Sequence, residues 1–207
     1  MAGEPTEPIS LFPIPIYTAV MQGFEEHRQP LVDEIRAFRD TNPGIRRSNR
    51  AAWHSPERFS RSPHVQWALA SVSHFAQAAL AKYYDGWEHL ALGVSGYWAN
   101  IVGPGGWNAP HHHAPQHWSA VYYVDVELPG PGRDELEGMI EFLNPLPWQA
   151  IWGGSGNSAH QPKNGMCILF PAPLIHFVHP HSQEMERISI AMNFQVLPRP
   201  PQAARRG

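Results

Sequence analysis

The sequence of 207 residues has a single cysteine, few charged residues and no long hydrophobic run. One cysteine excludes a disulfide within the chain, and Cys167 lies in an apolar segment that predicts a small buried core residue. Charged residues make up 16% of the chain and basic runs are no longer than arginine pairs, so we expect neither nucleic-acid nor membrane-surface binding. The first residues lack the basic and apolar regions of a secretory signal, and no segment is long enough to cross a bilayer, which predicts a cytoplasmic protein.

Histidine and tryptophan are abundant instead, with thirteen and eight residues. Eight of the histidines fall between His111 and His181, which is denser than ordinary surface usage. The tryptophans are spread along the chain, and this spread favours core and pocket walls over a stacking platform for bases. The histidine-rich half is therefore where we look for chemistry.

The order of the predicted elements indicates one domain over residues 1–207. An apolar segment with prolines, residues 9–20, predicts an edge strand. Helices are predicted at about 29–41, with Pro30 in the first turn, and from Ser62 as cap for about five turns. Residues 45–61 form a polar link that the pattern predicts to be a surface loop. Short strands punctuated by Gly and Pro then follow, at residues 96–102, 111–113, 119–128, 138–143, 166–170 and 187–196.

Helices followed by evenly spaced strands predict a mainly β fold, a cupin-like jelly roll or double-stranded β-helix with N-terminal helices. We expect helical support over about 24–84, the β core over about 90–197 and a disordered tail at 198–207. The Gly- and Pro-rich segment 144–164 is long enough to be either a mobile lid or a poorly ordered loop, and a lid is favoured if a metal pocket lies beside it.

Three histidines are candidate metal ligands. Side chains two apart on a strand point to the same face, so His111 and His113 can converge on one ion while His112 points away. A third ligand must come from elsewhere, and His176, which follows the strand 166–170, is best placed. His179 is a rival for that role, and His113 could instead contact the substrate or orient a ligand. Otherwise His112, His117, His179 and His181 are expected to be exposed or rim groups.

The last predicted strand carries a candidate anion site. Strand alternation puts Arg187, Ser189, Ala191 and Asn193 on one face and an apolar stripe on the other. An arginine fork grips a carboxylate through two charge-assisted hydrogen bonds. Asn100 is either a second polar group of this pocket or a partner of the backbone.

These segments together resemble the 2-oxoglutarate and Fe(II)-dependent dioxygenases, most closely a bacterial and phage branch. The resemblance covers nearly the whole chain, and the sequences that carry it are LFPIPI at 11–16, SN at 48–49, WHS at 53–55, YWANI at 97–101, N-x-x-H-x-H at 108–113, SAVYYV at 119–124, FPAPLIHFVHP at 170–180 and RISIAMNF at 187–194.

The resemblance implies an oxidoreductase that binds Fe(II) and 2-oxoglutarate and releases succinate and carbon dioxide. It implies His111, His113 and His176 as iron ligands, with His113 where the family usually has aspartate. It also implies Arg187 and Tyr123 at the far carboxylate of 2-oxoglutarate, where Ser189 and Asn100 are expected beside them. For residues 48–55 the resemblance suggests contact with the mouth of the pocket.

Three alternatives follow from the all-histidine set. The first is a hydroxylase that acts on a small molecule or a peptide with dioxygen. The second is a cupin-type dioxygenase that does not use 2-oxoglutarate, although the glutamate that cupins add shortly after H-x-H is missing here. The third is a metal-binding protein without turnover on the same scaffold.

Overall fold

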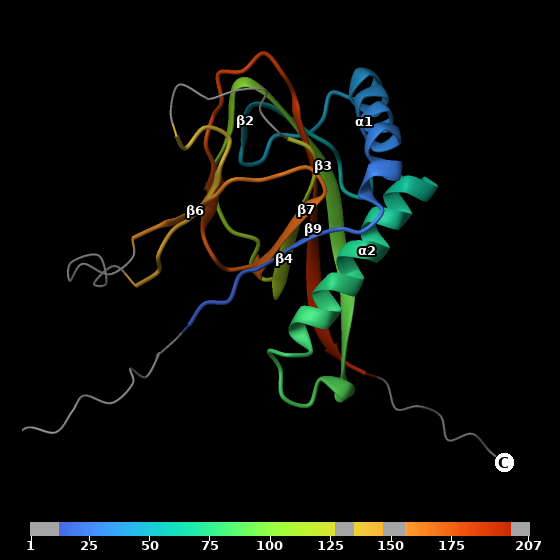
Figure 1. Cartoon of the computed structure of the whole chain (residues 1–207), viewed down its shortest axis with the longest axis vertical. Coiled ribbons are helices and arrows are strands. Elements are labelled where there is room, and N and C mark those ends of the chain that lie inside the picture. The colour runs from blue at the N-terminus through green and yellow to red at the C-terminus, as the bar shows by residue number, and fades with distance from the viewer. Residues whose placement is uncertain (1–12, 127–134, 147–155, 200–207) are drawn as a thin grey trace, which may run out of the picture.

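The computed structural model describes residues 13–126, 135–146 and 156–199, in which two helices lie against one face of a curled antiparallel sheet (Figure 1). The predicted mainly β jelly roll is therefore confirmed. The helices are α1 (Phe24–Thr41), α2 (Pro63–Leu80) and the short 3-10 helix Trp87–His89. The strands are β1 (Tyr17–Val20), β2 (Asn49–His54), β3 (Leu90–His111), β4 (Trp118–Asp125), β5 (Ile140–Phe142), β6 (Ser158–His160), β7 (Met166–Pro171), β8 (His176–Val178) and β9 (Arg187–Pro198).

The sheet brings distant segments of the chain together. Its strand order is β1-β7-β4-β9-β3-β8-β5-β6, and β2 pairs with β3. The long pair of β3 and β9 lies at the centre, in a register that joins Val102 to Arg187 and Asn100 to Ser189. Strands β4 and β8 flank this pair, one on each side. The segments that carry the candidate histidines and the candidate anion site are thus neighbours in one sheet.

The two faces of β9 have different partners, as the alternation predicts. Its apolar stripe is fully buried in the core that the helices form with the sheet, and it consists of Ile188, Ile190, Met192 and Phe194. Burial of each such side chain stabilises the fold by about 1.5 to 3 kcal/mol. Its other face lines a cavity on the inner side of the sheet with Arg187, Ser189, Ala191 and Asn193.

Helix α2 begins where the sequence predicts. The Oγ of Ser62 accepts a hydrogen bond from the Val65 backbone N–H at 3.2 Å, and Pro63 occupies the first position of the helix. This cap satisfies one of the free N–H groups of the first turn. The apolar stripe of α2 faces the sheet with Val65, Ala68, Val72, Ala76, Ala79 and Leu80 buried.

Helix α1 differs from the prediction at its start. It begins at Phe24, so Pro30 lies inside the helix rather than in its first turn. Packing explains the earlier start, because Phe24 packs against the core and its ring lies directly over Gly165. The acidic Glu25 and Glu26 also favour the first turn through the helix dipole.

The prediction of a loop for the link 45–61 is wrong for six of its residues. They form β2, which pairs with β3 from Asn49 opposite Asn108 to His54 opposite Asn100. A bulge at Ala51, whose φ is 46°, hides the strand pattern in the sequence. Strands β6 and β8 were not predicted either, because each has three residues and carries no measurable alternation.

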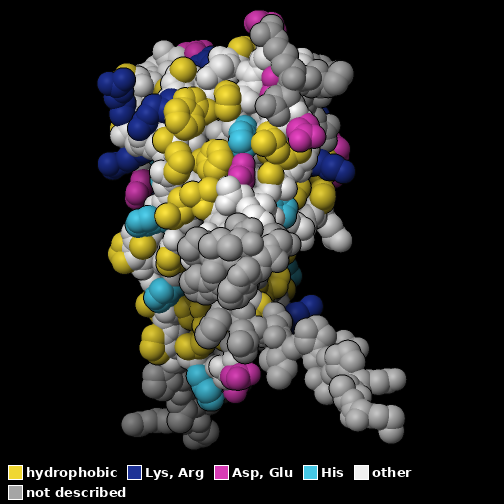
Figure 2. Space-filling view, turned by 90° about the vertical axis from the view of Figure 1, so that its left-hand side faces the viewer, with side chains coloured by type: hydrophobic (Ala, Val, Ile, Leu, Met, Phe, Trp, Pro, Cys, Tyr) yellow, Lys and Arg dark blue, Asp and Glu magenta, His cyan; other side chains and the backbone are white. Residues whose placement is uncertain are grey.

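Other parts of the predicted organisation stay predictions. Most of the proposed tail and the middle of the proposed lid, residues 200–207 and 147–155, lie outside the described residues. The described residues contain no helix with the length and apolarity to span a membrane. On the face shown in Figure 2, hydrophobic, acidic and histidine side chains are mixed, and Lys and Arg side chains gather near one upper corner.

Candidate active site

A cavity of about 550 Å³ opens on the inner side of the sheet. Its walls come from β2, β3, β4, β5, β8 and β9, from the links that precede and follow β2, and from the turn after β3. All seven predicted site residues line it, namely Asn100, His111, His113, Tyr123, His176, Arg187 and Ser189. Sequence reasoning thus selected residues that the fold brings to one place.

The three predicted histidines form a compact cluster. One ring nitrogen from each of His111, His113 and His176 lies within 4.8 Å of the others. His111 pairs directly with His176 across β3 and β8, which sets two of the rings side by side. The Nε2 atoms of His113 and His176 are 3.3 Å apart. This spacing suits three donors around a single ion.

Backbone carbonyls orient two of the rings. The Nδ1–H of His111 donates to the Ala109 carbonyl at 2.7 Å, and that of His176 donates to the Leu174 carbonyl at 2.9 Å. Each bond leaves the Nε2 lone pair of its ring available to a metal. Burial lowers the pKa of all three histidines, to about 3 for His113 and His176, so the rings are neutral donors at pH 7.

His113 is held in a different way. Strand β3 ends at His111, so simple alternation does not place His113, whose backbone N–H instead bonds the Ala172 carbonyl at 2.7 Å. Its ring stacks on Trp98 at a centroid distance of 5.5 Å, and Trp98 stacks on His54 in turn at 5.4 Å. Aromatic packing therefore sets the orientation of this third ring.

Arg187 is a buried cation without a described anionic partner. Its side chain is 4% exposed, and its Nε has no hydrogen-bond partner among the described residues. Burial lowers the pKa of Arg187 to about 10. The hydroxyl of Tyr123 is also buried, and it has no partner among the described residues. Burial raises the pKa of Tyr123, and the nearby Arg187 opposes part of this rise. Unsatisfied buried donors at this position favour a bound anion.

The backbone leaves room around the guanidinium. Gly138, with a φ of 69°, lies so close that an added Cβ would stand 3.0 Å from Nη1 of Arg187. Ser189 pairs with both Asn100 and Tyr123 in the sheet, so these polar side chains surround the same part of the cavity. Asn193 accepts a hydrogen bond from Ser119 at 2.8 Å, which gives it a structural partner.

The remaining histidines lie outside the cluster. His179 bonds to the Glu141 carboxylate at 2.5 Å, so the rival to His176 is engaged elsewhere. His112 and His117 are exposed, as expected for rim groups. The expectation that His181 is an exposed or rim group is wrong: its side chain is 2% exposed, and its ring bonds the Val102 carbonyl at 3.2 Å.

Sequence reasoning expected the segment 48–55 at the mouth of the pocket, but it assigned no individual role to three further lining residues. His54 is 6% exposed and its Nδ1 bonds the Ser55 carbonyl at 2.6 Å. Arg47 and Glu57 line the same cavity from either side of β2. The tripeptide 53–55 and the dipeptide 48–49, which belong to the family resemblance, were the signals that could have found them.

The donor set fits Fe(II). Three neutral imidazoles on one side of a cavity suit a divalent transition metal and leave coordination positions open toward the cavity. Nε of Arg187 and the hydroxyl of Tyr123, which have no hydrogen-bond partner among the described residues, belong to side chains of the same cavity, where a dicarboxylate that reaches the metal could also reach them. Both groups that the resemblance implies therefore have suitable residues in place.

Comparison with known proteins leads to the same class. Residues 96–193 match the model of a family described as "Putative 2OG-Fe(II) oxygenase". No curated protein matches the sequence closely enough to count as a relative.

Solved structures share the fold. A prolyl-4-hydroxylase from Pseudomonas putida is 16% identical, with a TM-score of 0.59 over 88% of this chain and 92% of that one. The α-ketoglutarate-dependent carbocyclase SnoK from nogalamycin biosynthesis is 8% identical, with a TM-score of 0.65 over 94% and 85% of the two chains. HygX from Streptomyces hygroscopicus, solved with nickel and 2-oxoglutarate, is 11% identical, with a TM-score of 0.56 over 88% and 83%.

The jelly roll, a cluster of histidines that could hold a metal ion and the family match together indicate a non-haem oxygenase. Through the family match over residues 96–193 and the shared fold, the chain is similar to the 2-oxoglutarate and Fe(II)-dependent oxygenases. These findings indicate an oxidoreductase that uses Fe(II) and 2-oxoglutarate.

Proposed function

We propose that this protein hydroxylates a small molecule or a peptide and releases succinate and carbon dioxide. The observation that carries the proposal is the buried Arg187, which has no described anionic partner in the cavity of the histidine cluster. An uncompensated buried charge destabilises a fold unless a ligand neutralises it. The far carboxylate of 2-oxoglutarate would be that ligand.

In this proposal His111, His113 and His176 hold Fe(II) through their Nε2 atoms. Fe(II) and 2-oxoglutarate, once bound by these residues, would supply the chemistry that uses dioxygen to hydroxylate a C–H bond of the substrate, with succinate and carbon dioxide as the products of the keto acid. The protein would supply neutral donors and a fixed ligand geometry. Arg187 and Tyr123 would hold the far carboxylate, with Ser189 and Asn100 beside it.

The substrate would enter from the side of the cavity that 2-oxoglutarate leaves free. Trp98 and Val121 provide apolar wall, and Asn108 and Gln116 provide polar groups. One structural neighbour is a prolyl hydroxylase in complex with a peptide fragment, and another is HygX with hygromycin B bound. The shared fold is compatible with both kinds of substrate, and both are retained in the proposal.

A three-histidine dioxygenase that does not use a keto acid is the second candidate, since the cluster contains no carboxylate. In that enzyme Arg187 would remain a buried cation without a counter-ion, which is an expensive arrangement with no purpose. A metal-binding protein without turnover is the third candidate. Measurements of 2-oxoglutarate binding and succinate formation separate the three.

We predict that 2-oxoglutarate, added under argon to the Fe(II) protein, produces the visible charge-transfer band of a chelated keto acid. Arg187→Ala should weaken 2-oxoglutarate binding by roughly tenfold to a hundredfold, because it removes a charge-assisted contact. Iron occupancy should not change, since Arg187 is not in the histidine cluster. Titration of the band and metal analysis of the same samples measure both effects.

Admission of oxygen to the wild-type complex should then yield slow succinate formation even before a substrate is known. Arg61→Ala, which removes an exposed arginine outside the cavity, is the matched control and should titrate like the wild type. A protein that binds iron fully but shows neither band nor succinate would contradict the proposal and favour the three-histidine dioxygenase. A band without succinate would favour the metal-binding protein.

A further inference from the structure

The link that precedes β2 places a second arginine at the cavity. Arg47 lines the cavity of the histidine cluster and also a second hollow on the outer side of the β2–β3 ladder. The two hollows share Ile45 and His54 as well, so the link forms the wall between them. Arg47 is exposed, and no hydrogen bond or ion pair of its guanidinium occurs among the described residues.

The backbone around Arg47 is well fixed, although the side chain is exposed. Its N–H donates to Oδ1 of Asn49 at 2.7 Å, and its carbonyl accepts from Nη1 of Arg50 at 2.9 Å. The next residue, Ser48, accepts at its carbonyl from the Ala109 N–H at 2.9 Å. Ala109 in turn orients His111 through its own carbonyl. A short chain of bonds therefore ties Arg47 to the metal cluster.

The acidic residues nearby do not neutralise Arg47. Glu186 is the acidic residue of the outer hollow, and it is bound by Arg36 and Arg39. Glu57 lines the inner cavity, but its carboxylate lies over Gly96. The link that carries Arg47 packs against Asn108, which is far from Gly96 along β3.

With Fe(II) and 2-oxoglutarate bound, the formal charges of the cavity sum to one positive charge. Fe(II) and 2-oxoglutarate carry equal and opposite charges, and the three histidines are neutral donors. Among the residues that the structure describes, the charged lining residues apart from histidines are Arg47, Glu57 and Arg187. The family usually has an aspartate ligand, whose negative charge would cancel this remaining positive charge. The neutral His113 that stands at this position does not cancel it. An anionic group on the substrate would restore the balance.

We propose that the substrate carries a carboxylate or phosphate group and that Arg47, at the rim of the cavity, binds it. Both groups accept the paired hydrogen bonds that a guanidinium offers. Ser48 and Asn108 stand beside Arg47 in the lining, joined by a hydrogen bond of 3.3 Å, and present further polar atoms to the same group. This inference rests on the proposed function, because it assigns the substrate side of that same cavity.

Binding of simple probes to the anaerobic Fe(II)–2-oxoglutarate complex tests the inference. Benzoate and phenyl phosphate are the anionic probes, and benzamide is the neutral probe of similar size. The position of the charge-transfer band and tryptophan fluorescence report binding, since Trp98 lines the cavity. We expect at least one anionic probe to bind at least about tenfold more tightly than benzamide, and less tightly as salt is added.

Arg47→Ala should weaken binding of that anionic probe by about tenfold or more, and Arg47→Lys should weaken it less because the charge is kept. Arg61→Ala, which removes an exposed arginine from outside both hollows, should bind the probe like the wild type. All three variants should keep the 2-oxoglutarate band, which shows that the iron site is assembled.

Binding of benzoate alone identifies a carboxylate, and binding of phenyl phosphate alone identifies a phosphate. Equal binding of benzamide, an absence of binding by both anionic probes, or wild-type binding by Arg47→Ala would overturn the inference while the proposed function stands. Absence of the 2-oxoglutarate band in the wild type would instead overturn the proposed function and this inference with it.

Discussion

His113 is the residue that most distinguishes this site from the usual one. It stands where an aspartate is usual in the family, and it is oriented by stacking on Trp98 rather than by a carbonyl bond like those of His111 and His176. Stacking constrains the plane of the ring, but it leaves the ring free to slide within that plane. We therefore infer that His113 is the most weakly held of the three donors.

Substitution of His113 tests whether it binds the metal. His113→Asp should keep Fe(II), because aspartate is the usual occupant of that position and supplies an oxygen donor. His113→Leu should weaken Fe(II) binding by at least about tenfold. Loss of a residue that only orients a metal ligand already costs about that much, and loss of a ligand itself should cost more. Metal analysis after dialysis against a weak chelator measures both variants.

His176→Ala is the reference for a lost ligand, since His176 is nearly fully buried and carbonyl-oriented. Circular dichroism shows whether each variant is folded. Wild-type iron occupancy in a folded His113→Leu protein would show that His113 is a neighbour of the metal and not a ligand.

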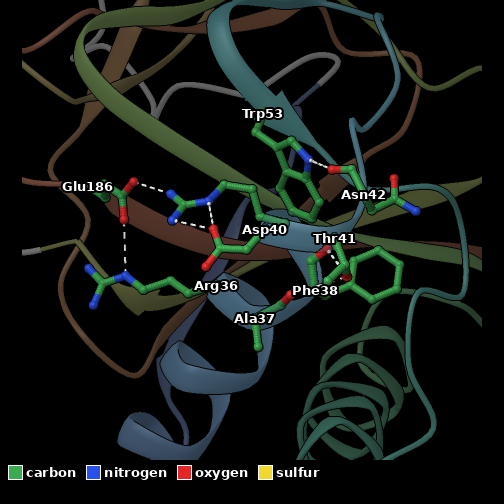
Figure 3. Close-up of polar contacts among 9 residues, drawn as sticks. Arg36, Ala37, Phe38, Asp40, Thr41, Asn42, Trp53 and Glu186 are labelled. Carbon is green, nitrogen blue, oxygen red and sulfur yellow. Dashed lines mark hydrogen bonds and ion pairs between the residues drawn. The ribbon is translucent and has the colours of Figure 1, made fainter.

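At the scale of elements, β9 connects the helical layer to the candidate anion site. Glu186, which precedes the strand, accepts from Nε of Arg36 at 3.0 Å and is also bound by Arg39, both from α1 (Figure 3). The next residue, Arg187, enters the cavity from the first position of the strand. These ion pairs fix the start of β9, and with it the position of the guanidinium.

We predict that Glu186→Ala destabilises the protein by about 1 kcal/mol, the upper range for half-exposed ion pairs, because it breaks two contacts between α1 and β9. Urea unfolding of the apoprotein measures the change, and a double-mutant cycle with Arg39→Ala isolates the coupling. Asp40→Ala is the matched control: Asp40 also pairs with Arg39, but it is more exposed and lies on α1 itself. An equal effect of the two substitutions would show that Glu186 does not anchor the strand.

At the scale of the whole molecule, one sheet separates a structural face from a chemical face. The helices cover the outer face, where the larger core cluster lies, and the cavity occupies the inner face. A smaller apolar cluster, which includes Tyr123, Ile140, Phe142 and Phe170, packs beside the cavity. A ligand that bridges the metal and Arg187 would therefore join β3, β8 and β9 from the inside.

We predict that 2-oxoglutarate raises the melting temperature of the Mn(II)-loaded protein, in which turnover does not occur. At a hundredfold excess over Kd, binding to the folded state alone adds about 2.7 kcal/mol, which for a chain of this size corresponds to roughly 5 to 10 °C. Differential scanning fluorimetry measures the shift. Arg187→Ala should reduce it strongly, and an equal shift in that variant would mean that the keto acid does not reach the arginine.

Local patterns in the sequence determined much of this protein. The alternation of β9 predicted which side chains enter the cavity, since side chains of a strand alternate whatever the strand pairs with. Ser62 and Pro63 marked the start of α2 for a similarly local reason. The H-x-H motif and His176 indicated the metal cluster, although the way in which His113 reaches it depends on the turn after β3.

Only the tertiary structure decided the rest, because it depends on partners far away in the chain. Strand β2 exists through its pairing with β3, and a bulge conceals its period. That pairing turns the link before β2 into a wall of the cavity and brings Arg47 to its rim. His181 is buried because the chain folds back onto Val102, which no nearby residue indicates. Long-range pairing, rather than local propensity, thus placed the residues that we expect to select the substrate.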